Sequence, residues 1–151
     1  RIPILNNLIE CGFSISLWGS YWNRIRETKD VAQGMADSGT LRKVLSNTKC
    51  ALTLVRRSNR DGHAMRSFEV AAIGSPSLVE DTFEHRELFG AESENVMYFG
   101  SDEELLLKVS WFMNNPKEAT LMGIRMREHI RSRPNTYRDR LRSMIKESDK
   151  L

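Results

Sequence analysis

The feature that most limits how this chain can fold is an almost unbroken apolar run at residues 50–55, Cys-Ala-Leu-Thr-Leu-Val. A strand with one face in water alternates apolar and polar residues, whereas a continuous run is typical of a strand covered on both faces of a parallel sheet. Shorter strands are predicted at 76–79 and 96–99, with helical periodicity between them. We therefore predict an α/β fold, a Rossmann-like parallel sheet with helices on both faces.

The rest of the chain is predicted to supply one more strand and several helices. The strand is expected at 13–18, where apolar residues alternate with serines, whereas 21–39 gives only a weak indication of a helix. A single helical turn is expected at 85–89. The stronger helical patterns lie at 2–11, at 40–48 with Thr40 as N-cap, at 63–73 before Gly74, at 102–114 after Ser101 with Glu104 in the capping-box position, and at about 117–132 and 135–147.

Composition excludes several classes of protein. The chain has 151 residues, of which 40% are hydrophobic, so it has the size of one domain and enough apolar surface for a core. No run approaches the roughly 18 apolar residues of a membrane span. The three histidines are too scattered for a metal site, and no G-x-G-x-x-G motif suggests a dinucleotide oxidoreductase. Cys11 and Cys50 lie among apolar neighbours and are predicted to be buried thiols of a cytoplasmic protein.

Positive charge is concentrated near the end of the chain. Residues 125–151 hold nine Lys and Arg against four Asp and Glu, whereas the other residues hold fourteen against sixteen. Such a basic segment allows a solvated helical face, a peripheral contact with an anionic membrane, or a nucleic-acid patch. Nucleic acid is not expected, because neither interleaved aromatic residues nor a nucleic-acid motif accompanies the charge. A solvated or interdomain face is favoured.

The loop after the strand at 50–55 is the candidate site, because ligands bind α/β sheets at the carboxyl ends of the strands. Gly62 leads from this loop into the helix predicted at 63–73. The N–H groups at a helix N-terminus have no intrahelical partner and form a ready site for phosphate. The side chains that could add charge-assisted hydrogen bonds to a diphosphate are Arg57, Arg60 and Arg66.

Two acids accompany this loop, Asp61 before the helix and Glu69 within it. An acid that accepts hydrogen bonds from vicinal hydroxyls is a common way for an α/β sheet to hold a ribose. The spacing alone leaves a surface interpretation open, in which Glu69 pairs with Arg66 and Asp61 belongs to a turn. A second charged segment, 84–87 (Glu-His-Arg-Glu), is expected to be mainly charged surface.

The spacing of the two acids resembles a known signature. Asp61 and Glu69 are separated by seven residues, and the small-residue run 71–76 (Ala-Ala-Ile-Gly-Ser-Pro) follows. This pattern is similar to the donor-binding signature in the C-terminal half of GT-B glycosyltransferases of the group 1 type. The segments 65–69 (Met-Arg-Ser-Phe-Glu) and 136–140 (Thr-Tyr-Arg-Asp-Arg) most resemble the branch that contains the spore maturation protein CgeB.

The resemblance implies a nucleoside-diphosphate sugar as donor substrate and a role for each matching residue. Glu69 would accept hydrogen bonds from the ribose hydroxyls, and Asp61 would face the hydroxyls of the donor sugar. The backbone of Gly62, His63, Ala64 and Met65 would lie against the diphosphate. Arg57 and Arg66, proposed above for their charge, complete the expected donor-binding set. Two positions depart from the broad group, which usually has Glu in place of Asp61 and often Gly in place of Ala64.

The resemblance also implies how the protein is organised. Residues 1–132 would form the nucleotide-sugar-binding domain, and 133–151 a basic helical tail. Because the chain does not begin with Met, we expect it to lack the first strand of this half and the whole N-terminal acceptor-binding half. The general base would lie on that half, so no catalytic residue is assigned and the chain alone is expected to be inactive. Helix amides and arginines would stabilise the leaving diphosphate without a metal. The alternative is a non-catalytic α/β binding or interaction module.

Overall fold

Two parallel sheets form within residues 2–59 and 61–148, the part of the chain that the computed structural model describes. The larger sheet has the order β3-β4-β5, with β3 at Ala51–Thr53, β4 at Ser77–Glu80 and β5 at Met97–Phe99. All three strands run in the same direction, so β4 is hydrogen-bonded along both edges. These strands confirm the three predicted from the apolar runs.

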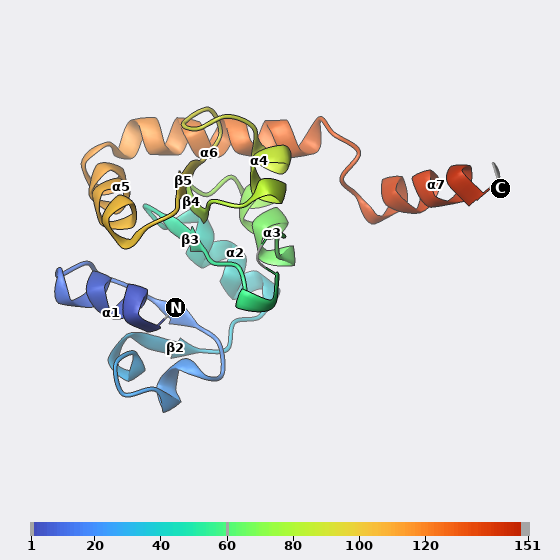
Figure 1. Cartoon of the computed structure of the whole chain (residues 1–151). Coiled ribbons are helices and arrows are strands. Elements are labelled where there is room, and N and C mark those ends of the chain that lie inside the picture. The colour runs from blue at the N-terminus through green and yellow to red at the C-terminus, as the bar shows by residue number, and fades with distance from the viewer. Residues whose placement is uncertain (1, 60, 149–151) are drawn as a thin grey trace.

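Helices cover both faces of this sheet, as predicted (Figure 1). In chain order they are α1 (Ile2–Glu10), α2 (Ser38–Ser46), α3 (Met65–Ile73), α4 (Phe83–Phe89), α5 (Asp102–Asn114), α6 (Pro116–Arg131) and α7 (Tyr137–Ser148). Neighbouring residues of a strand point to opposite faces, so Leu78 and Val79 of β4 lie in different clusters. The first cluster joins α1, α5 and α6 to the sheet through Leu8, Leu78, Met97, Phe99, Leu105, Val109, Phe112, Ala119 and Met122. The second joins α3, α4 and α6 through Ala51, Val70, Ala71, Val79, Phe89, Val96, Tyr98, Met126 and Ile130.

The segment before α2 differs most from the sequence-based predictions. The strand expected at 13–18 is reduced to β1 (Leu17–Trp18), although Phe13 and Ile15 still pack against the first cluster. The weak helix expected at 21–39 is wrong, because this segment forms β2 (Ala32–Gly34), which pairs with β1 in parallel, and two short 3-10 turns at Trp22–Arg24 and Lys29–Val31. A three-residue strand is too short to produce a hydrophobic period.

Two local predictions near the helix ends need correction. Helix α2 begins before Thr40, because Asp37 is the N-cap and its Oδ1 accepts a hydrogen bond from the Thr40 N–H at 2.7 Å. Cys11 is exposed at the turn after α1, not buried, whereas Cys50 packs partly buried against the first cluster. The cap at Ser101 is confirmed, since its Oγ accepts from the Glu104 N–H at 3.2 Å.

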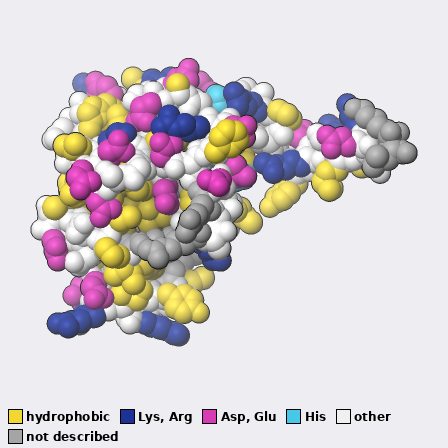
Figure 2. All heavy atoms as spheres, in the orientation of Figure 1, with side chains coloured by type: hydrophobic (Ala, Val, Ile, Leu, Met, Phe, Trp, Pro, Cys, Tyr) yellow, Lys and Arg dark blue, Asp and Glu magenta, His cyan; other side chains and the backbone are white. Residues whose placement is uncertain are grey.

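Helix α7 extends away from the body of the molecule (Figure 1). Its apolar residues lie on one side of the helix and are all more than half exposed: Tyr137, Leu141, Met144 and Ile145. Figure 2 shows such hydrophobic atoms on the projecting tail next to Lys and Arg side chains. Helix α7 contacts the body through Arg140, whose guanidinium lies over the Phe68 ring of α3 at 5.3 Å.

The backbones of α3 and α6 approach closely at a pair of glycines. A Cβ atom added to Gly123 of α6 would lie 2.3 Å from the carbonyl oxygen of Gly74, at the end of α3, and 2.9 Å from the carbonyl carbon of Ser75. Both contacts are to backbone, which cannot swing aside as a long side chain can. Gly123 therefore sets how closely α6 packs against the helix that carries the candidate site.

We predict that Gly123→Ala lowers the free energy of unfolding by about 1–3 kcal/mol, the usual cost of overpacking. In an unpacked helix the same change would stabilise by up to about 1 kcal/mol, so the sign of the effect tests the packing. Urea denaturation would measure it, with Lys117→Ala on the exposed first turn of α6 as control. A stabilised Gly123→Ala variant would contradict the close approach.

Candidate functional site

The candidate site lies where the larger sheet ends at its carboxyl edge. The loop 54–64 follows β3 and leads to α3, and residues 81–82 follow β4 and lead to α4. The two strand ends are tied together by Glu80, whose Oε2 accepts a hydrogen bond from the Val55 N–H at 2.7 Å. The N-termini of α3 and α4 therefore start from one fixed edge.

Helix α3 begins without a capping side chain on its N-cap residue. That residue is Ala64, which has no side-chain acceptor. Within the described residues no side chain accepts a hydrogen bond from the N–H of Met65 or Arg66, while the Ala64 N–H makes only a long bond of 3.4 Å to the Ser67 Oγ. Orphan N–H groups at the positive end of a helix dipole favour an anion. Neither Ala64 nor a Gly at this position could supply a capping acceptor, and the Ala64 methyl group leaves less room for a phosphate beside the backbone than Gly would.

The first turn of α4 holds the loop that precedes α3. Thr82 Oγ1 donates to the carbonyl oxygen of Gly62 at 3.0 Å, and the Glu84 N–H donates to the carbonyl oxygen of Asp61 at 3.1 Å. Glu84 Oε2 accepts from the His63 N–H at 2.9 Å and lies 2.5 Å from His63 Nδ1. The hydrogen bond from the His63 ring is the main reason that the pKa of Glu84 lies below its ordinary value. A carboxylate therefore already occupies one amide that the resemblance assigns to the diphosphate.

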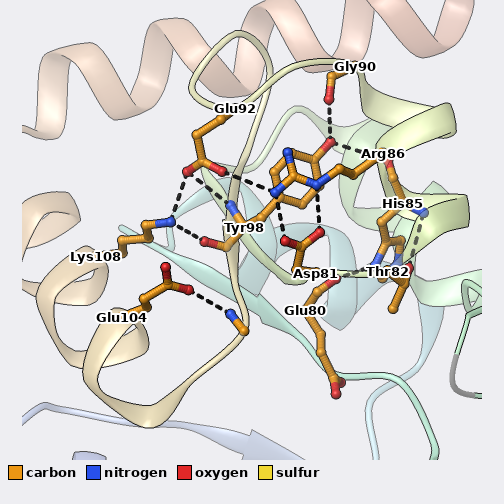
Figure 3. Close-up of polar contacts among 11 residues, drawn as sticks. Glu80, Asp81, Thr82, His85, Arg86, Gly90, Glu92, Tyr98, Glu104 and Lys108 are labelled. Atoms are coloured by element: carbon orange, nitrogen blue, oxygen red, sulfur yellow. Dashed lines mark hydrogen bonds and ion pairs between the residues drawn. The ribbon is translucent and has the colours of Figure 1, made fainter.

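His85 links three elements from a fully buried position beneath this loop. Its Nδ1 lies 2.7 Å from the carbonyl oxygen of Glu80, at the end of β4, and its Nε2 lies 2.8 Å from Ser67 Oγ, in the first turn of α3. A carbonyl can only accept, so Nδ1 carries the proton and Nε2 accepts from the Ser67 hydroxyl. Figure 3 shows the His85 ring between Thr82 and Glu80. Burial is the main reason that the pKa of His85 is lowered from 6.5.

A second polar cluster stabilises the turn after β4 and the loop before β5 (Figure 3). Arg86 donates from Nε and from Nη2 to the two carboxylate oxygens of Asp81, both at 2.6 Å, and its guanidinium lies 4.4 Å from the centre of the Tyr98 ring. Hydrogen bonding from Arg86 is the main cause of the lowered pKa of Asp81. Lys108, on α5, also belongs to this cluster, because its Nζ donates a hydrogen bond to Glu92 Oε1 at 3.0 Å. Arg86 is thus committed to an intramolecular ion pair.

The segment 84–87 was expected to be mainly charged surface, and the structure corrects this for His85. The fully buried imidazole supports the candidate loop, and Glu84 contacts the loop directly. The available signal was Thr82, three residues before His85, in the spacing of an N-cap; its Oγ1 accepts from the His85 N–H at 3.1 Å. Ser67 was missed because a lone serine inside a helix carries no pattern.

The two acids proposed to contact the donor lie at the surface. Glu69 Oε2 pairs with Arg66 Nη1 at 2.6 Å, with the two side chains 40% and 52% exposed, as the surface interpretation of the sequence predicts. Such a pair contributes only about 0.2–0.5 kcal/mol, so a ligand can compete with it. Asp61 is exposed, and its backbone carbonyl makes the bond to Glu84.

The remaining predicted site residues surround the helix entrance. Gly62 is buried under Asn59, whose side chain would lie 2.2 Å from an added Cβ and donates to the His63 carbonyl oxygen at 2.9 Å. The His63 ring packs edge-on against Phe68 at 5.1 Å, and Met65 is largely exposed. The side chain of Arg57 and the whole of Arg60 lie outside the described part of the chain.

Other places in the described structure offer less. A hollow of about 300 Å³ is lined by Ser93, Met97, Trp111, Glu118, Leu121, Met122 and Arg125. It lies at the start of β5, the opposite edge from the candidate loop. In residues 2–59 and 61–148 no group of three or more His, Cys, Asp or Glu side chains is placed to hold a metal ion. No helix in the same residues is long and apolar enough to cross a membrane.

Comparison with known proteins identifies the family of the chain. A family model described as glycosyl transferase-like matches residues 2–146, almost the whole chain. The chain belongs to this glycosyltransferase-like family. Membership implies a nucleotide-sugar donor and an acceptor as the substrates of the family's chemistry. No curated protein sequence matches the chain.

We predict that His85 makes the stability of this glycosyltransferase-like chain depend on pH. The pKa of His85 is 6.5 in the unfolded chain and lower in the folded chain. At pH values between these two pKa values, the unfolded chain therefore binds more protons than the folded chain. The contribution of the neutral ring is complete above pH 6.5 and is lost as the pH falls from there toward the folded-state pKa. His63 on the loop, with Glu80 and Glu84 beside the ring, are the other charged groups that act on it.

Urea denaturation at several pH values from about 7 to 5 measures this loss. The His85→Gln variant should show a flatter pH dependence than the wild type. Equal slopes for the wild type and His85→Gln would contradict the prediction.

Proposed function

We propose that this chain binds the nucleoside-diphosphate part of a sugar donor and is the donor-binding half of a glycosyltransferase. The observation that carries the proposal is the uncapped N-terminus of α3, held at the carboxyl edge of a parallel sheet by the first turn of α4. Anions bind at such helix ends, and ligands of α/β sheets bind at such edges. The match to the glycosyl transferase-like family supports the same assignment.

In this proposal each part of the donor has a matching group. The N–H groups of Met65 and Arg66 bind the diphosphate, together with those of Gly62, His63 and Ala64 where the ligand displaces Glu84 from the His63 N–H. Glu69 exchanges its surface contact with Arg66 for the ribose hydroxyls, which frees the Arg66 guanidinium for a phosphate oxygen. Asp61, exposed at the loop, faces the donor sugar, and Arg57 adds positive charge from the same loop.

The reaction proposed is transfer of the sugar to an acceptor. The bond between the anomeric carbon and the diphosphate oxygen breaks, a bond to an acceptor oxygen forms, and the acceptor proton passes to a base on an acceptor-binding half. Negative charge builds on the leaving diphosphate, where helix N-terminal amides and arginine stabilise it without need of a metal. We also propose that the chain belongs to the group 1 type and, through 65–69 and 136–140, to the CgeB-like branch.

We expect at least one of UDP, GDP, ADP and TDP to raise the melting temperature. A ligand at one hundred times its dissociation constant adds about 2.7 kcal/mol to the stability of the folded chain. Differential scanning fluorimetry with each nucleotide measures the shift. Glu69→Ala should remove most of it, because the ribose loses its acceptor, while the unfolding free energy without ligand changes only by the small value of an exposed ion pair.

Glu128→Ala provides the matched control, since Glu128 is also an exposed helical acid but lies on α6. It should bind nucleotide as the wild type does. If none of the four nucleotides shifts the melting temperature, donor binding is wrong and the non-catalytic module becomes the better description. The exposed Asp61 and the intramolecular pairing of Glu69 are the features that would then favour it.

A further inference from the structure

We propose that His85 and Ser67 form a positioning pair that sets where the N-terminal amides of α3 meet the donor diphosphate. The inference rests on the proposed function and extends it to two buried residues that have no direct contact with the ligand. His85 belongs to α4 and Ser67 to α3, so the pair joins two helices whose first turns border the same site.

The geometry shows why this pair bears on the amides. Ser67 lies in the first turn of α3, two residues after Met65, and is fully buried. Its hydroxyl lies 2.8 Å from His85 Nε2, and its backbone N–H donates to the Ala64 carbonyl oxygen at 2.9 Å. A displacement of Ser67 therefore moves the N-cap residue and the amides beside it.

The anchor for the pair is the end of the central strand. His85 Nδ1 donates to the Glu80 carbonyl at 2.7 Å, and the ring stacks on Phe89 of the second core cluster at 5.8 Å and an interplanar angle of 28°. The imidazole thus has a fixed position and a fixed tautomer, because the Glu80 carbonyl can only accept, which puts the proton on Nδ1 and leaves Nε2 to accept from the Ser67 hydroxyl. A hydrogen bond weakens outside about 2.7–3.2 Å. The two successive hydrogen bonds, from Glu80 to His85 and from His85 to Ser67, therefore hold α3 at a defined distance from β4.

The arrangement differs from a nucleophilic serine with its histidine base. Both side chains are fully buried, and the Ser67 hydroxyl lies between a helix backbone and the imidazole. A buried polar pair that is fully hydrogen-bonded rigidifies the elements that it joins. The effect expected on function is therefore one of position, with amides held ready for the diphosphate before it binds.

Two substitutions break the link from opposite sides. Ser67→Ala removes the hydroxyl. His85→Asn keeps an amide donor near the Nδ1 position, toward the Glu80 carbonyl, but cannot reach Ser67. The ligand is the nucleoside diphosphate that best stabilises the wild type, and we expect each substitution to weaken its binding about tenfold. This is the lower end of the loss in affinity seen at metal sites when a hydrogen bond that orients a ligating residue is removed. The double variant should lose no more than either single one, because both remove the same bond.

Two further variants separate position from stability. His85→Gln carries its amide near the Nε2 position, can still accept from Ser67, and should retain most of the affinity. Val109→Ala creates a cavity in the first cluster, on the opposite face of the sheet, and should lower the melting temperature while leaving the dissociation constant unchanged. Isothermal titration calorimetry at a temperature where every variant is folded measures the affinities.

The outcomes distinguish this inference from the proposed function. Wild-type affinity in Ser67→Ala and His85→Asn, with a wild-type chain that binds, would overturn the positioning role and leave donor binding intact. Losses that merely follow the melting temperature, with Val109→Ala affected equally, would also overturn it. Failure of the wild type to bind any nucleoside diphosphate would overturn the proposed function and this inference with it. If His85→Asn does not fold, Ser67→Ala and His85→Gln still decide the question.

Discussion

The hydrogen bonds made at the end of β4 are the constraint on which the candidate site depends. Glu80 uses two groups there: its carboxylate accepts from the N–H of Val55, beyond β3, and its carbonyl accepts from His85, on α4. Strand ends in a parallel sheet leave backbone groups without a ladder partner, and each must be satisfied or exposed. By satisfying them with neighbouring elements, β4 fixes the loop before α3 and the first turn of α4 in one arrangement.

Several charged groups at this edge are already paired within the chain. The N-terminus of α3 carries positive partial charge, and the Glu84 carboxylate lies on the N–H of His63 at the helix entrance. Arg66 and Arg86 are likewise paired, with Glu69 and with Asp81. An incoming diphosphate must therefore compete with internal carboxylates, and its affinity reflects the difference between the two sets of contacts. The surface pair at Glu69 is easier to exchange than the doubly hydrogen-bonded pair at Asp81.

The fold could be predicted where a segment's own pattern carries the information. The run at 50–55 predicted a buried parallel strand, and β3 lies there with helices packed on both faces of its sheet. Ser101 with Glu104 predicted a helix start, which the hydrogen bond between them confirms. The prediction failed at β2, where three residues are too few to show a period, and at Thr40, whose own N–H donates to the Asp37 carboxylate that caps the helix.

The sequence by itself determined the three strands of the larger sheet and the helices between them, the loop that carries the acids, and the resemblance of that loop to a donor site, because these depend on residues close together in the chain. Only the tertiary structure decided which side chains support the loop. Ser67 and His85 are 18 positions apart, and His63 and Glu84 are 21 apart. Such pairs form because parallel strands bring the loops after β3 and β4 to one edge. Their distances and burial arise from packing across the sheet, which no local pattern records.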